Sequence, residues 1–454
     1  MYRHIFQPVV LLSINKIHNK MRTYLWFCIL IFGFIPSAGA QQVSRRLSLE
    51  ELFSLGMENS LSVKSAETQE QIAEEQWQTA KAERLPDIRV GLEAGNIGQP
   101  IIFRRGLTRP EYPETPDWRQ NYNVELTQPL YDGGRIRSGI RQGKIRRHIA
   151  LLNTANSKES LKLQLLQRYM ELFTLYKQKE VLARNIDESV HRLEDIRRMR
   201  KEGLLTRNDE LRSELQLTND KLDYSETEHQ IILASQALDI LLGLGESLLL
   251  VPDTTVLDAT FSVNALEDYI QMAYEHNLAM KIARENTLLT RNNVASARSE
   301  LLPALSLRAG NTLARPVSST MEDYYNNSWN ITLNVSFNLS SLYRGRHRVR
   351  EAEHNVQSQL YAEELQKQAI RSDVRSAYIR NEESLERVKA LMLSVSQASE
   401  NYRIMQNRYL NQLSILTDLL DASNVRLEAE LRLVSAKAET VYTYYELQRI
   451  CGKL

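Results

Sequence analysis

Polar and apolar residues alternate strictly along four short stretches of this chain, while most of the rest follows a helical period. The apolar positions of the four stretches are Ile88, Val90 and Leu92; Tyr122, Val124 and Leu126; Leu305, Leu307 and Ala309; and Trp329, Ile331, Leu333 and Val335. A two-residue period is typical of a strand with one apolar and one polar face. The pattern predicts two β-hairpins, at about residues 87–131 and 304–339.

Each hairpin is followed by a very long stretch with few helix breakers. Residues 135–200 contain no Pro, and residues 346–410 contain neither Gly nor Pro. In the second stretch, apolar residues such as Leu385, Val388 and Met392 recur at three- and four-residue steps, which is the pattern of a coiled coil. We expect long helices at about 135–201 and 346–410, each roughly 100 Å long at ~1.5 Å per residue. Shorter return helices are expected at about 207–242 and 416–450.

The two halves of the chain are copies of one plan. The segment from Ala80 to Pro86 matches the segment from Ala297 to Pro303, 217 positions later, whereas Asp209 matches Asp418 at an offset of 209. We therefore divide the mature chain into a first repeat, 41–250, and a second repeat, 251–454. Each repeat comprises a helix, a β-hairpin, a long helix and a return helix.

The hairpin strands have the length of about ten residues that a transmembrane β-strand needs. Four strands cannot close a barrel, and an open edge in lipid would leave backbone groups unpaired. A membrane location therefore requires oligomerisation, and a trimer would give a twelve-stranded barrel with an open lumen. The fold class expected is mainly α with a small β part. A hairpin on a small soluble sheet and a coiled-coil rod are the alternatives.

The N-terminus predicts export, and the composition argues against several functions. Residues 1–40 are predicted to be a signal peptide whose true start is Met21, because an apolar run follows a short basic start and ends at Ala38-Gly39-Ala40. The 57 basic and 56 acidic residues are balanced, which argues against nucleic-acid binding. We find no nucleotide loop and no Cys or His pattern for a metal, so we expect no enzyme activity, no cofactor and no metal.

The sequence resembles the TolC family of outer-membrane efflux and export proteins over nearly the whole mature chain. The segment from Gln128 to Arg135, QPLYDGGR, is similar to the family's strand-to-helix junction. The segments around Arg408-Tyr409 and Thr417-Asp418 are similar to the family's hairpin tip. Ser414 stands where the family has an Arg, and Gln412 stands where it has a Gly.

The resemblance implies a homotrimer in the outer membrane, with a helical tunnel in the periplasm that meets a periplasmic adaptor and an inner-membrane pump. It implies an aperture constricted by Asp418 and Asp421, and a hairpin-tip latch of Asp209 and Tyr409. Tip turns that dock the adaptor would contain Gly203, Thr206, Gln412 and Ile415. We expect a passive outer-membrane channel of a tripartite efflux or type I secretion system. The alternative is a structural coiled-coil envelope protein, or a periplasmic adaptor without pore activity.

Overall fold

The structure is a computed structural model that describes residues 44–114, 116–245, 248–253, 264–316 and 322–454. The predicted signal peptide, residues 1–40 with Met21, lies outside the described residues. Within the described ranges, no helix combines the length and the apolar character needed to cross a membrane.

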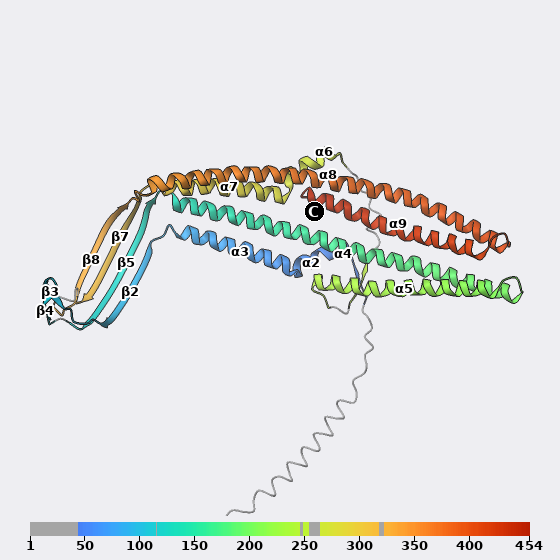
Figure 1. The fold of residues 1–454 in the computed structure, drawn as a ribbon, viewed down its shortest axis with the longest axis horizontal. Helices are drawn as coiled ribbons and strands as arrows, with labels where there is room; N and C mark the ends of the chain where they lie inside the picture. The colour runs from blue at the N-terminus through green and yellow to red at the C-terminus, as the bar shows by residue number, and fades with distance from the viewer. Residues whose placement is uncertain (1–43, 115, 246–247, 254–263, 317–321) are drawn as a thin grey trace, which may run out of the picture.

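A four-stranded antiparallel sheet lies at one end of the molecule (Figure 1). Its strands are β2 (Asp87–Asn96), β5 (Trp118–Asp132), β7 (Ala304–Arg315) and β8 (Asn326–Ser336), in the order β2-β5-β7-β8. Leu126 lies opposite Ile88 on one side and Ala309 on the other. The two hairpins therefore join through β5 and β7 and share one apolar face, while β2 and β8 remain as edges.

Two long antiparallel helix pairs extend from this sheet and end in tight turns at the far end (Figure 1). In the first pair, α4 (Arg135–Lys201) packs against α5 (Arg207–Leu242); in the second, α8 (Ser341–Leu410) packs against α9 (Leu416–Ile450). Helix α8 begins before the expected position near 346 and includes Gly345. A Cβ at Gly345 would lie 2.5 Å from Cδ2 of Leu301, so the missing side chain lets this neighbour pack closely.

The helix that opens each repeat is divided in two, which the sequence pattern did not predict. The first is α2 (Leu49–Asn59) and α3 (Leu61–Ala82), and the second is α6 (Leu266–His276) and α7 (Leu278–Ser299). At the first division the Asn59 Nδ2 donates to the Leu242 carbonyl at 2.9 Å; at the second the Asn277 Nδ2 donates to the Ile450 carbonyl at 2.9 Å. Each division thus supplies a donor to the free C-terminal carbonyls of a return helix.

The largest core lies midway along the molecule, where α2, α4, α5 and β6 (Leu249–Pro252) meet. Strand β6 pairs in parallel with β1 (Ser44–Leu47). The buried Tyr169 hydroxyl donates to the Leu47 carbonyl at 2.8 Å and accepts from the Asp253 amide at 2.8 Å. A further short hairpin, β3 (Ile102–Arg105) and β4 (Thr108–Glu111), lies in the connection between β2 and β5. The predicted class, mainly α with a small β part, is confirmed.

Candidate functional site: the exposed sheet and the helical tips

The apolar face of the sheet is open to solvent in the single chain. Val90 is 68 % exposed, Trp329 73 % and Ile331 65 %. The opposite face carries Arg89 and Glu125 instead. An exposed apolar surface that extends over four strands is typical of a face that contacts lipid or protein.

Exposed aromatic side chains stand at both ends of this apolar face. They are Trp118, Tyr324 and Tyr325 at the far end and Tyr131, Phe337 and Tyr343 at the end that joins the helices. Transmembrane β-strands carry such aromatic bands at the two membrane interfaces. The apolar face of the sheet, with these aromatic side chains in and beside its strands, has the pattern of a membrane-spanning β-surface.

The tip turns of the two helix pairs share one backbone conformation but differ in capping. Gly203 has φ +80° and Gln412, at the equivalent position, has φ +60°. Thr206 caps α5 through a capping box with Asp209, whereas Ile415 at the start of α9 provides no side-chain cap. The first tip is thus held by two reciprocal hydrogen bonds, which the second tip lacks.

Asp209 and Tyr409 form no hydrogen bond with each other, but the negative charge of Asp209 acts on the Tyr409 hydroxyl. Tyr409 is buried, and its hydroxyl has no partner among the described residues. Burial, followed by the negative charge of Asp209, raises the pKa of Tyr409 to about 12. The Asp209 carboxylate accepts from the Thr206 amide at 3.0 Å and from the Thr206 hydroxyl at 2.7 Å.

Other residues, which the sequence pattern did not single out, connect the two helix pairs near the tips. The Arg212 Nη1 donates to the Thr417 hydroxyl at 2.7 Å, and the buried Arg192 Nη2 donates to the Ser423 hydroxyl at 3.1 Å. The signal for Arg192 was its place in the buried stripe of α4, at helical spacing from Ser189 and Ile196. A cation on such a stripe needs polar partners from a neighbouring element.

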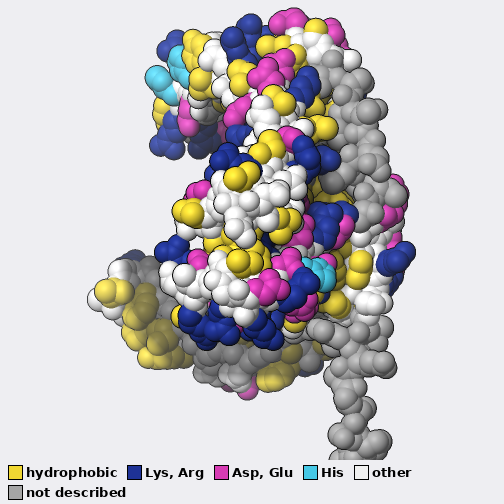
Figure 2. Space-filling model, turned by 90° about the vertical axis from the view of Figure 1, so that its right-hand side faces the viewer, with side chains coloured by type: hydrophobic (Ala, Val, Ile, Leu, Met, Phe, Trp, Pro, Cys, Tyr) yellow, Lys and Arg dark blue, Asp and Glu magenta, His cyan; other side chains and the backbone are white. Residues whose placement is uncertain are grey.

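Asp418 and Asp421 lie close together on α9 and both are exposed, while Leu419 and Ala422 are buried. The two acids therefore point away from the helical packing, one turn apart. In the end-on view of Figure 2, acidic and basic side chains are mixed over the surface.

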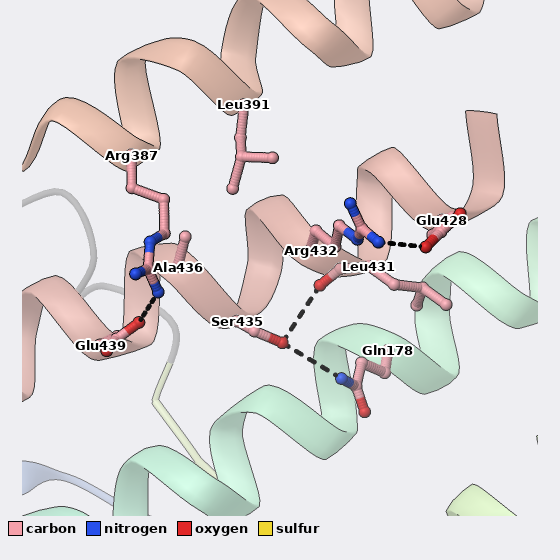
Figure 3. Close-up of a pocket in the computed structure, with 9 residues that line it drawn as sticks. All are labelled: Gln178, Arg387, Leu391, Glu428, Leu431, Arg432, Ser435, Ala436 and Glu439. Carbon is pink, nitrogen blue, oxygen red and sulfur yellow. Dashed lines mark hydrogen bonds and ion pairs between the residues drawn. The ribbon is translucent and has the colours of Figure 1, made fainter. Parts of the chain in front are cut away.

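A groove of about 630 Å³ lies on the helical surface between α4, α8 and α9 (Figure 3). Its charged side chains pair with one another: Arg387 with Glu439 at 3.1 Å, and Arg432 with Glu428. The Gln178 amide donates to the Ser435 hydroxyl at 3.4 Å. Within the described part of the chain, no group of three or more His, Cys, Asp or Glu side chains is placed to hold a metal ion.

Comparison with known proteins gives a family and a fold. The chain is similar to the outer membrane protein VceC from Vibrio cholerae, with 16 % identity, a TM-score of 0.75, and coverage of 89 % of this chain and 96 % of that chain. It is also similar to the Neisseria gonorrhoeae MtrE outer membrane channel, with 18 % identity, a TM-score of 0.71, and coverage of 89 % and 88 %. The Campylobacter jejuni CmeC outer membrane channel is similar as well, with 16 % identity, a TM-score of 0.72, and coverage of 89 % of this chain and 85 % of that chain.

The search of curated proteins found no significant match. The family model described as Outer membrane efflux protein matches residues 52–244 and 269–453, which is most of the chain and includes both repeats. The chain therefore belongs to the outer membrane efflux protein family, whose members are channel proteins and not enzymes.

Proposed function

We propose that this protein is the outer-membrane channel of a tripartite efflux or type I secretion system. It would conduct substrates passively from a periplasmic adaptor and an inner-membrane pump to the exterior. The observation that carries this proposal is the four-stranded sheet with an exposed apolar face, joined directly to a 67-residue and a 70-residue helix. At ~1.5 Å per residue, each helix reaches roughly 100 Å from the sheet.

The open edges of the sheet support a homotrimer. Strands β2 and β8 each have one neighbour within the chain. In lipid their free backbone groups need partners, which the edges of two further copies supply when three sheets form one twelve-stranded barrel. The long helices would then line a tunnel on the periplasmic side.

At the tips, Asp418 and Asp421 would form rings of carboxylates at the aperture, three from each position in a trimer. Asp209 and Tyr409 would act as a latch between the two hairpin tips. The exposed turns with Gly203, Thr206, Gln412 and Ile415 would dock the adaptor. The exposure of both acids and the effect of the Asp209 charge on the pKa of Tyr409 support these assignments.

The test is expression of the full chain followed by membrane fractionation and gel electrophoresis with and without heating. We expect the mature protein in the outer-membrane fraction, migrating as a trimer until it is heated. The purified protein should open discrete channels in a planar bilayer. Recovery as soluble, non-trimeric protein that opens no channel would refute the channel and favour a structural coiled-coil protein or an adaptor.

A further inference from the structure

The two long helices that leave the sheet both begin with basic residues and no acidic ones. Between Arg135 and Ala150, α4 carries Lys and Arg but no Asp or Glu, and the same is true of α8 between Ser341 and Arg350. The cations are Arg135, Arg137, Arg141, Lys144, Arg146 and Arg147 in α4 and Arg344, Arg346, Arg348 and Arg350 in α8. The overall charge of +1 conceals this local excess beside the sheet.

Most of these cations form no ion pair. Arg135 lies 3.7 Å from Asp132, Arg147 pairs with Glu74, and Arg348 pairs with Glu300. Among the residues that the structure describes, no carboxylate lies within ion-pair distance of the other seven, and all seven are exposed. Unpaired cations at this density repel one another, so an external anion would stabilise them.

The packing of α4 leaves one row of these cations on an open face. On one side α4 meets α3, where Gly143 approaches Trp77; on the other it meets α7, where the Ser138 hydroxyl donates to the Asn292 carbonyl at 3.2 Å. Arg137, Arg141 and Lys144 follow i, i+4, i+7 spacing and lie between these two contacts. In α8, Arg346 and Arg350 have i, i+4 spacing, away from the contact of Gly345 with Leu301.

The handedness of the chain places this row on the apolar side of the sheet. The Val124 carbonyl points to Gly310 of β7, and the Val124 side chain lies on the apolar face. We view the apolar face with β5 running upward and the Val124 side chain toward the viewer. For an L-residue in this orientation the carbonyl points to the right, so β7 lies on the right of β5 and β2 lies on its left. The helices that continue these strands keep the order, so α3 lies left of α4 and α7 lies right.

A right-handed helix with those two neighbours directs Arg137, Arg141 and Lys144 toward the viewer, that is, to the apolar side. Helix α8 runs in the same direction as α4 and lies next to α7, on the side away from α4. The contact with α7 includes the Thr287 hydroxyl, which donates to the Glu363 carboxylate at 2.6 Å. The same geometry directs Arg346 and Arg350 to the apolar side. Arg146 and Arg344 lie on the opposite face.

We propose that Arg137, Arg141, Lys144, Arg346 and Arg350, which we call the basic collar, bind anionic phospholipid headgroups of the leaflet next to the helices. The inference rests on the proposed function, because it requires the sheet to span the membrane. Lys144 and Arg350 lie nine residues along their helices from Arg135 and Ser341, or roughly 14 Å at ~1.5 Å per residue. The headgroup layer is roughly 5–8 Å thick, and its negative charge acts over a further Debye length of about 8 Å. All five collar residues therefore lie within reach of the headgroups, and their long side chains add to that reach.

The test compares two variants that each lose two charges per protomer. The collar variant is Arg141→Gln with Arg346→Gln, and the matched control is Arg146→Gln with Arg344→Gln on the opposite face. Each detergent-purified protein is incubated with equal amounts of phosphatidylglycerol and phosphatidylcholine, and native mass spectrometry counts the retained lipids. We expect wild type and control to prefer phosphatidylglycerol, and the collar variant to lose on the order of tenfold in that preference.

A collar variant with the wild-type preference, or an equal loss in both variants, would overturn the proposal. Planar bilayers of phosphatidylcholine separate this result from a failure of the channel. Wild type and the collar variant should open channels of equal conductance there, since no collar residue lines the lumen. The control should also open channels, but its conductance is not compared, because Arg146 and Arg344 face the lumen. If wild type opens no channels, the proposed function is wrong, and the collar proposal, which depends on it, is wrong as well. If channels form but phosphatidylglycerol is not preferred, the collar alone is wrong.

Discussion

At the scale of single residues, the helical part contains an unfavourable group, a buried carboxylate without a hydrogen-bond partner among the described residues. Asp239 of α5 is fully buried, and neither of its carboxylate oxygens has a hydrogen-bond partner among the described residues. Burial raises the pKa of Asp239 from 3.8 to about 6. Because the folded state holds the proton more tightly than the unfolded state, the ionised carboxylate destabilises the fold above about pH 6, and this cost disappears as the pH falls below 4.

We therefore expect Asp239→Asn to stabilise the protein by about 1–2 kcal/mol at pH 7.5 and to have little effect at pH 4. The measurement is urea unfolding of the detergent-solubilised protein at both pH values. Asp187→Asn is the control, because Asp187 lies on the surface of α4 with a side chain that is 78 % exposed. A variant no more stable than wild type at pH 7.5 would show that Asp239 has a partner in solution.

The proposed aperture can also be tested at single residues. Replacing both acids, Asp418→Asn with Asp421→Asn, removes six negative charges from a trimer while keeping side-chain size. We expect higher single-channel conductance and a block by Mg²⁺ that is weaker by about tenfold, because carboxylates are the ligands such cations prefer. Glu428→Gln, an exposed change farther along α9, should leave both unchanged. Wild-type conductance and block in the double variant would exclude both acids from the aperture.

At the scale of elements, the two tip turns give a reciprocal experiment. Gln412 holds a left-handed conformation that costs a residue with a side chain about 1–2 kcal/mol, whereas Gly203 adopts it freely at the equivalent position. Gln412→Gly should stabilise the second tip by about 1 kcal/mol, and Gly203→Gln should destabilise the first by a similar amount. Hydrogen exchange at each tip measures both changes. Equal exchange in all three proteins would mean that the turns relax in solution.

The same scale shows what the sequence could and could not predict. Strict alternation predicted the four strands, and the absence of breakers predicted the long helices, because each signal is local. The division at Asn277 escaped detection because no Gly or Pro marks it; it depends on a distant contact with Ile450. The pairing of β1 with β6 is likewise a tertiary contact between short segments far apart in the chain.

The tips show the same limit for the candidate site. The duplicated pattern aligned Gly203 with Gln412, and the structure gives both the same turn. The bond from Arg212 to Thr417 could not be predicted, since it depends on how two hairpins from different repeats lie side by side. Counting charges over the whole chain also hid the basic collar, whose cations are balanced by acids elsewhere.

At the scale of the whole molecule, the proposed assembly depends on the two free edges of the sheet. In the proposed barrel, β2 of one copy pairs with β8 of the next, and a head-to-tail contact of this kind either closes into a ring or continues as a filament. Membrane insertion requires the ring, because only a closed ring leaves no free edge in lipid. Three copies give the twelve strands of the proposed barrel.

We therefore expect Val90→Cys in β2 and Ile331→Cys in β8, combined with Cys451→Ala, to crosslink between chains with a short thiol-reactive reagent. Denaturing gels should show two-chain and three-chain products and nothing larger, because a ring of three offers no fourth edge. The control pair is Val124→Cys with Asn311→Cys, which lie opposite each other within one sheet and should crosslink only within a chain. Products that stop at two chains, or that continue beyond three, would refute the trimer, whereas the control reports whether the sheet itself has formed.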